Sequence, residues 1–120
     1  MFELSIKGDF SSAHFLRQYE GKCQHLHGHN WKLEVFVAST ELNGSGMVAD
    51  FGELKKQLKI VLAHLDHVCL NEIDFFKDNN PTAENIAKYI YDEFSKVIEP
   101  LKVSKVRVWE TDNNSVTYYE

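Results

Sequence analysis

Residues 23–37 read CQHLHGHNWKLEVFV, and this stretch decides how the chain is built. Its apolar residues recur at every second position, at Trp31, Leu33, Val35 and Val37. Successive side chains of a β-strand point to opposite faces, so the alternation predicts a strand with one buried face. His27 and His29 are also two residues apart, so in an extended strand they point the same way and can both reach one ion.

The density of metal-binding side chains indicates a metal site at this strand. Four of the six histidines and the thiol of Cys23 fall within sixteen residues once His14 is included. A catalytic zinc site takes three protein ligands and a water, so a third imidazole from a neighbouring strand would complete it. Two other interpretations remain open: a solvated histidine-rich loop, and a structural zinc site that uses Cys23 itself. The spacing also leaves His25 as a possible ligand, because it shares the strand face of His27 and His29.

Length and charge narrow the class of protein. The chain has 120 residues and is expected to form one domain over residues 1–120. Its 13 basic residues are scattered along a chain of net charge -5, so no nucleic-acid surface is expected. Without a signal peptide or an apolar run of membrane-spanning length, the chain is expected to be cytoplasmic and to bind no membrane. Cys23 and Cys69 are expected to be reduced, and Cys69 to be buried.

The other elements follow from periodicity and from turn residues. Phe2, Leu4 and Ile6 alternate with polar residues, which predicts a first strand before the histidines. The turn signal NGSG at residues 43–46 precedes a predicted amphipathic helix over residues 51–65. Asp50 and Glu53 have the spacing of a capping box at its start.

A second apolar stripe predicts a helix over residues 83–98, with Thr82 as its N-cap and Pro100 after its end. Strand patterning returns at residues 103–108 and 116–118, on either side of a turn at residues 112–114. The predicted fold is therefore α+β: a ββααββ unit with a four-stranded antiparallel sheet and two helices on one face. The outer strands of such a sheet have unpaired edges, which edge-to-edge assembly into a ring would cover.

Five short motifs, in order along most of the chain, resemble those of the 6-pyruvoyl-tetrahydropterin synthase and 6-carboxytetrahydropterin synthase family. They are FSSAH at residues 10–14, Cys23 with LHGHN at 26–30, LDH at 65–67 with Leu70-Asn71, PTAEN at 81–85, and WET at 109–111. The resemblance implies the tunnelling fold (T-fold), whose unit has the ββααββ order reached above. It also implies a homo-oligomer in which three units close a barrel and two trimers stack into a hexamer.

The resemblance further implies how the site is divided. Zn²⁺ would be held by His14, His27 and His29, with His25 left out. Cys23 would be the base that removes a proton, because a nearby cation lowers a thiol pKa. Asp66 and His67 would form a second catalytic pair that comes from a neighbouring subunit. Taken alone, an Asp-His pair after an apolar helix is more often a helix terminus.

Three more residues are implied to bind the substrate. Glu110 would anchor the pterin ring, because a carboxylate can accept two parallel N–H bonds. Thr82 and Glu84 lie in another family motif, although both also suit the first turn of a helix. No glycine-rich loop marks a triphosphate site, and Arg17, Lys22 and Lys102 are the candidates to contact it.

The function implied is a zinc-dependent lyase that converts 7,8-dihydroneopterin triphosphate to 6-carboxy-5,6,7,8-tetrahydropterin, releasing triphosphate and acetaldehyde on the route to queuosine. The short chain and the compact segment from Cys23 to His27 favour this product. One alternative is the 6-pyruvoyl-tetrahydropterin synthase of tetrahydrobiopterin synthesis, which keeps the three-carbon side chain. Another is a non-catalytic oligomeric pterin-binding protein, in which Cys23 would be a ligand of a structural zinc.

Overall fold

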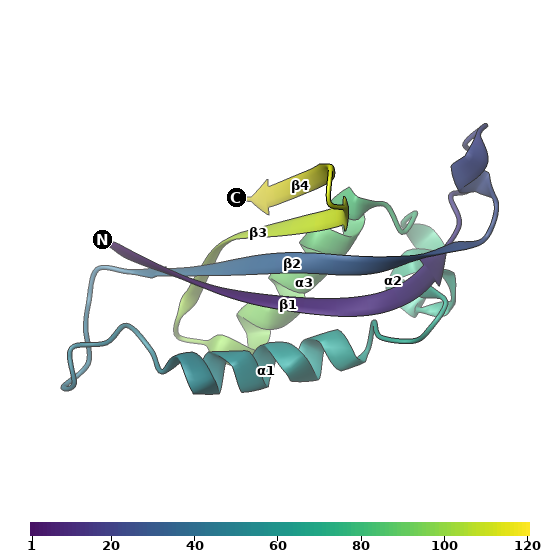
Figure 1. The fold of residues 1–120 in the computed structure, drawn as a ribbon. Coiled ribbons are helices and arrows are strands. Elements are labelled where there is room, and N and C mark those ends of the chain that lie inside the picture. The colour runs from purple at the N-terminus through teal and green to yellow at the C-terminus, as the bar shows by residue number, and fades with distance from the viewer.

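The structure is a computed structural model that describes residues 1–120. Four strands, three α-helices and two short 3-10 helices follow one another along the chain (Figure 1). Their bounds are β1 Phe2–His14, η1 Lys22–Gln24, β2 His27–Ser39, α1 Phe51–Ala63, η2 Leu70–Glu72, α2 Asp74–Asp78, α3 Ala83–Ile98, β3 Lys102–Thr111 and β4 Asn114–Tyr119. The predicted order of two strands, two long helices and two strands is confirmed, and the short helices η1, η2 and α2 are additions to it.

The strands form one antiparallel sheet in the order β1-β2-β3-β4. The predicted alternation in β2 is confirmed, because Trp31, Leu33, Val35 and Val37 are all buried on its inner face. A register shift at Phe36/Val37 accounts for the broken alternation in the partner strand, where Val103 and Val106 are both buried. At the other end of β2 the register pairs His27 with His14.

Both long helices cover the same face of the sheet. In Figure 1, α3 crosses behind the sheet and α1 runs along β1, and the contacts agree, since α1 packs on β1 and α3 on β3 and β4. The core between these layers holds 21 buried apolar residues. Gly8 lets α1 approach closely, because a Cβ added there would lie 2.7 Å from Leu62 Cδ1. The predicted arrangement of two helices on one face is confirmed.

The helix ends differ in part from the prediction. Helix α1 ends at Ala63 and not at residue 65, and its first residue, Phe51, is 52% exposed. Asp50 caps α1 by accepting from the Gly52 N–H, while Glu53 accepts from the Gln57 side chain, so the reciprocal capping box is absent. Thr82 is the N-cap of α3 as predicted, since its hydroxyl accepts from the Asn85 N–H at 3.2 Å.

The two outer strands have edges of different kinds. Residues after α1 cover the outer edge of β1 near its end, because the His67 N–H donates to the Ser11 carbonyl and the Ala13 N–H to the Val68 carbonyl. No backbone partner covers β1 from Phe2 to Asp9, and β4 is the other open edge. Cys69, predicted to be buried, is only half-buried because it lies in this edge segment. No helix is long and apolar enough to cross a membrane.

Candidate active site

Three histidines meet where β1 ends and β2 begins. His14 and His27 are register partners on these strands, and His29 lies two residues along β2 on the same face. One ring nitrogen from each lies within 4.8 Å of the other two, so the three residues form a group that could hold a metal ion. The parity argument for His27 and His29 is confirmed, and β1 supplies the third imidazole.

Backbone carbonyls fix which nitrogens of two imidazoles face one another. His14 Nδ1 lies 2.7 Å from the Pro81 carbonyl, and His27 Nδ1 lies 2.7 Å from the His25 carbonyl. A carbonyl only accepts, so each Nδ1 carries the proton and each Nε2 has a free lone pair. The two Nε2 atoms lie 3.1 Å apart. Two lone pairs this close repel each other unless a cation lies between them.

The distances and burial fit a bound cation. Imidazole nitrogens on one tetrahedral ion, each at about 2.0–2.1 Å, lie about 3.4 Å from one another, close to the separation of the two Nε2 atoms. His29 Nε2 is buried and has no hydrogen-bond partner. Buried polar atoms normally have a hydrogen-bond partner, so an unpaired buried nitrogen is unusual. A bound ion would supply the missing partner. The residues present therefore fit a metal ion.

Burial also keeps the imidazoles in the neutral form that binds metals. His14 is fully buried, and burial is the main cause that lowers its pKa, against a smaller opposing effect of the Pro81 carbonyl. Burial likewise lowers the pKa of His29, although the nearby Glu110 carboxylate acts in the opposite direction. Trp31 contributes to this burial, since its ring packs edge-on against both imidazoles at 5.0 and 5.2 Å between centroids.

His25 and Cys23 lie outside the histidine group. His25 is exposed and precedes β2, so its side chain does not share the β2 face, and only its carbonyl contacts the group. Cys23 lies half-buried in η1, and its carbonyl accepts from the Leu16 N–H. Spacing alone allowed His25 as a ligand. It does not join the other three histidines because β2 begins only at His27.

A pocket of about 400 Å³ brings together four of the predicted site residues. Its polar lining includes Cys23 from η1, Thr82 and Glu84 from the start of α3, and Glu110 from the end of β3. The first residues of β4, Asn114 to Val116, complete one wall. The Glu110 carboxylate joins the pocket to the histidines, because its two oxygens lie 3.9 Å from the Nε2 atoms of His14 and His29. The Glu110 carboxylate thus links the candidate metal group to a pocket that also contains the Cys23 thiol.

Asp66 and His67 lie apart from this pocket, on the outer edge of β1. Asp66 Oδ1 accepts from the Ser11 N–H at 2.9 Å, and its Oδ2 lies 2.9 Å from His67 Nδ1. These hydrogen bonds, the one from Ser11 first, lower the pKa of the Asp66 carboxyl. The His67 side chain is 81% exposed and its backbone is left-handed, with φ 57°. The pair is therefore oriented but points to solvent from a single chain.

Two asparagine side chains, neither of them predicted to have a role at the site, hold the segment after His14. The Asn71 side chain accepts a hydrogen bond from the Phe15 N–H and donates one to the Phe15 carbonyl. Asn80 makes the same pair of hydrogen bonds to Arg17. Asn80 precedes Pro81, whose carbonyl orients His14. The position of Asn71 in a family motif and of Asn80 in a turn signal could have marked them, but neither signal specifies the partner.

The candidate triphosphate residues do not form a cluster. The Arg17 guanidinium donates to the Phe76 carbonyl at 2.6 Å, so it is already used within the chain. Lys22 is exposed in η1, near the pocket. Lys102 begins β3, whereas Glu110 lies near its other end. Lys102 is thus remote from the pocket.

The fold and the site define the class of protein as an α+β chain that brings three histidines together beside a pocket lined by a thiol and carboxylates. The family model described as 6-pyruvoyl tetrahydropterin synthase matches residues 3–120, and the chain belongs to this family. A 6-carboxy-5,6,7,8-tetrahydropterin synthase of Haemophilus influenzae is 36% identical, with both chains fully covered. A human 6-pyruvoyl tetrahydrobiopterin synthase is 37% identical over 97% of this chain and 90% of its own length.

A solved structure confirms the expected fold. The 6-pyruvoyl tetrahydropterin synthase of Caenorhabditis elegans superposes with a TM-score of 0.89 at 31% identity, covering 99% of this chain and 95% of its own. The tunnelling-fold unit expected from the motifs is therefore present here.

Proposed function

We propose that this chain is a zinc-dependent lyase that converts 7,8-dihydroneopterin triphosphate and one water to 6-carboxy-5,6,7,8-tetrahydropterin, with release of triphosphate and acetaldehyde. The observation that carries the proposal is the joint position of the histidine group and the pocket. His14 and His29 face Glu110 at 3.9 Å, and Glu110 shares the pocket with Cys23. The relatives with this activity in their names include the one from Haemophilus influenzae.

In this proposal His14, His27 and His29 hold Zn²⁺ through their Nε2 atoms. When bound there, the ion supplies Lewis-acid polarisation of the substrate's side-chain hydroxyls. Cys23 takes the proton from the adjacent C–H bond, because it is the thiol in the wall of the pocket. Glu110 accepts hydrogen bonds from the N–H groups of the pterin ring, which orients the reacting side chain toward the histidines.

Thr82 and Glu84 complete the substrate pocket in this proposal. Both line it, and both lie at the start of α3. The Thr82 hydroxyl already accepts from the Asn85 N–H, which leaves its proton and one lone pair for a ligand. Glu84 is exposed and free to accept.

The active site is proposed to be shared between subunits of a trimer or hexamer. His67 is too exposed to serve a site within its own chain, and it does not line the pocket that holds Cys23. β1 and β4 run in opposite directions, so the open part of β1 in one copy can pair antiparallel with the open edge of β4 in the next. Pairing β1 of one copy with β4 of the next would bring Asp66 and His67 toward the pocket wall formed by residues 114–116.

The experiment that tests the reaction is incubation of the zinc-loaded protein with 7,8-dihydroneopterin triphosphate and mass analysis of the pterin product. The proposal expects 6-carboxytetrahydropterin. Unchanged substrate would contradict any lyase activity and favour the pterin-binding alternative with a structural zinc. That alternative needs Cys23 as a ligand, whereas the group whose geometry fits a metal ion consists of histidines alone.

A second candidate is 6-pyruvoyl-tetrahydropterin synthase activity. The human relative of that name is as similar as the 6-carboxy relative, at 37% against 36% identity. The same mass analysis separates the two, because the 6-pyruvoyl product keeps all three side-chain carbons and no acetaldehyde forms.

A further inference from the structure

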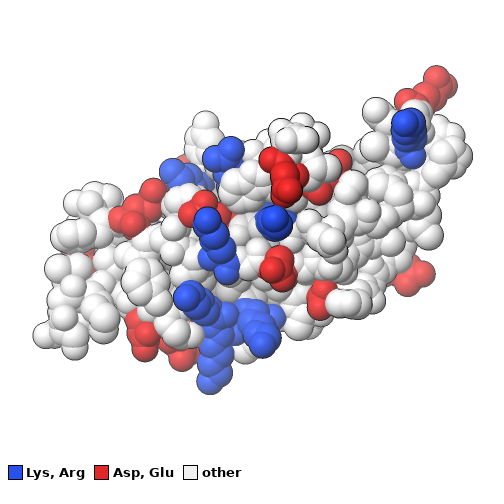
Figure 2. All heavy atoms as spheres, viewed as in Figure 1, with Lys and Arg blue, Asp and Glu red and all other residues white.

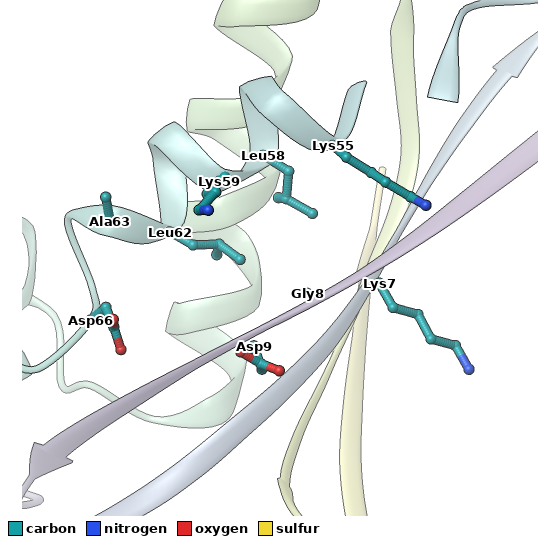
Figure 3. A pocket seen from close by; sticks show the side chains of 9 residues that line it. All are labelled: Lys7, Gly8, Asp9, Lys55, Leu58, Lys59, Leu62, Ala63 and Asp66. Atoms are coloured by element: carbon teal, nitrogen blue, oxygen red, sulfur yellow. The ribbon is translucent and has the colours of Figure 1, made fainter. Parts of the chain in front are cut away.

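A second pocket, of about 400 Å³, lies between β1 and α1 (Figure 3). Its charged lining consists of Lys7, Asp9, Lys55, Lys59 and Asp66. Figure 3 shows Lys55 extending from α1 toward β1, with Asp66 at the opposite end of the pocket. Lys7 borders the pocket at β1, but its side chain points away from α1. The pocket therefore leads from the Asp66-His67 pair to a basic end.

The lysines of this pocket have no partner of opposite charge. None of Lys7, Lys55 and Lys59 takes part in an ion pair, whereas the surface lysines elsewhere include several that do. Lys55 and Lys59 are four residues apart on α1, and like charges at this spacing repel each other. Figure 2 shows basic side chains gathered over the region of α1. The chain itself does not compensate this positive charge.

The two carboxylates of the pocket leave its basic end free. Asp66 is held by the Ser11 N–H and by His67, so its charge stays at the far end. Asp9 is exposed on β1 and makes no ion pair with a lysine of the pocket. Three lysines against two carboxylates leave the lining net positive, and most positive beside Lys55 and Lys59.

We propose that Lys55 and Lys59 bind the triphosphate of the substrate. This inference rests on the proposed function, in which Asp66 and His67 act on the side chain that carries the triphosphate. A lysine ammonium is a compact point charge that binds phosphate oxygens, and a polyanion removes the repulsion between the two lysines of α1. Because Asp66 belongs to the subunit that supplies the pair, these lysines act on the substrate held in the neighbouring copy's pocket.

Titration calorimetry with inorganic tripolyphosphate tests the inference without any reaction. The test compares the zinc-loaded wild type with Lys55→Gln/Lys59→Gln and with Lys56→Gln, a matched control on the exposed side of α1 outside the pocket. Binding by the double variant should be weaker by about tenfold or more, the scale of a lost charged hydrogen bond. Lys56→Gln should bind like the wild type. Binding of tripolyphosphate to the metal itself is the same in all three proteins and so cannot produce the difference.

The melting temperature controls for misfolding, since the double variant removes a repulsion and should melt no lower than the wild type. Equal binding by the double variant and the wild type would overturn the inference, as would an equal loss in Lys56→Gln or no binding by the wild type.

Turnover separates this inference from the proposed function. An active enzyme whose KM for the triphosphate substrate is unchanged in the double variant refutes the phosphate site alone. Lysine-dependent tripolyphosphate binding by a protein that does not turn over the substrate refutes the lyase alone.

Discussion

At the scale of single residues, the site depends on how each imidazole is oriented. The sequence predicted that His27 and His29 share a face, because strand parity is a local property. It could not predict that the Pro81 carbonyl orients His14, because the two residues are 67 positions apart and meet only through packing. Choosing His14, His27 and His29 over His25 required the family motif, since spacing alone allowed all of them.

Metal content should depend on His27 and not on His25. His27→Ala removes one of the two Nε2 atoms that lie 3.1 Å apart, so the variant should lose stoichiometric zinc. His25→Ala is the matched control, because it keeps the backbone carbonyl that orients His27. Metal analysis of the purified variants checks both. Full zinc in His27→Ala, or its loss in His25→Ala, would mean that the ligand set is wrong.

Turnover should depend on Cys23 while metal content does not. Cys23→Ala should retain zinc, and its turnover should fall by about two orders of magnitude or more, the usual scale for loss of a general base. Zinc and rate are measured on one preparation. A parallel loss of both would make Cys23 a ligand, and full activity would move the base to Glu20 or to the Asp66-His67 pair.

The metal-free protein should become less stable as the pH falls below about 6.5. The pKa values of His14 and His29 are lowered from 6.5 in the folded state, so the unfolded chain takes up more protons between the folded and unfolded pKa values. The contribution of these two histidines to the free energy of unfolding is fully present above pH 6.5. It is lost as the pH falls through their lowered folded pKa values. Melting temperatures against pH check this. His29→Gln should show a weaker dependence, and an equal slope in the variant would exclude this histidine as a cause.

At the scale of the elements, periodicity predicted the strands and the two long helices because each has one face in the core. It placed the end of α1 two residues late, since a stripe does not show where the partner layer stops. The edge segment of residues 66–69 was not predicted at all. Its hydrogen bonds to Ser11 and Ala13 join parts of the chain that are far apart in sequence.

The N-cap of α3 should contribute measurably to stability. Thr82→Ala removes the acceptor of the Asn85 N–H, which should lower the free energy of unfolding by about 0.5–2 kcal/mol. Thr82→Ser keeps the acceptor and should be close to the wild type. Thr40→Ala, at an exposed position outside the elements, is the control. Denaturant unfolding gives the values, and no loss in Thr82→Ala would leave substrate binding as the main role of this residue.

At the scale of the whole molecule, one chain holds two separate parts of the proposed site. The pocket with Cys23 lies at one end of the inner sheet face, and the Asp66-His67 pair lies on the outer edge of β1. The sequence predicted open edges but not that the segment holding Asp66 and His67 would cover part of one. Mixing inactive Cys23→Ala with inactive His67→Ala subunits under exchange conditions should therefore restore activity. Mixed oligomers that remain inactive would place both residues in the site of a single subunit.

The measurement that tests the central claim most directly is the yield of acetaldehyde and triphosphate from 7,8-dihydroneopterin triphosphate, for the zinc-loaded wild type and for His27→Ala. A metal-dependent lyase of the 6-carboxy type predicts equal amounts of the two products from the wild type and neither from the variant. Release of both by metal-free His27→Ala would contradict the role of the histidine group. Release of neither by the zinc-loaded wild type would contradict the reaction itself.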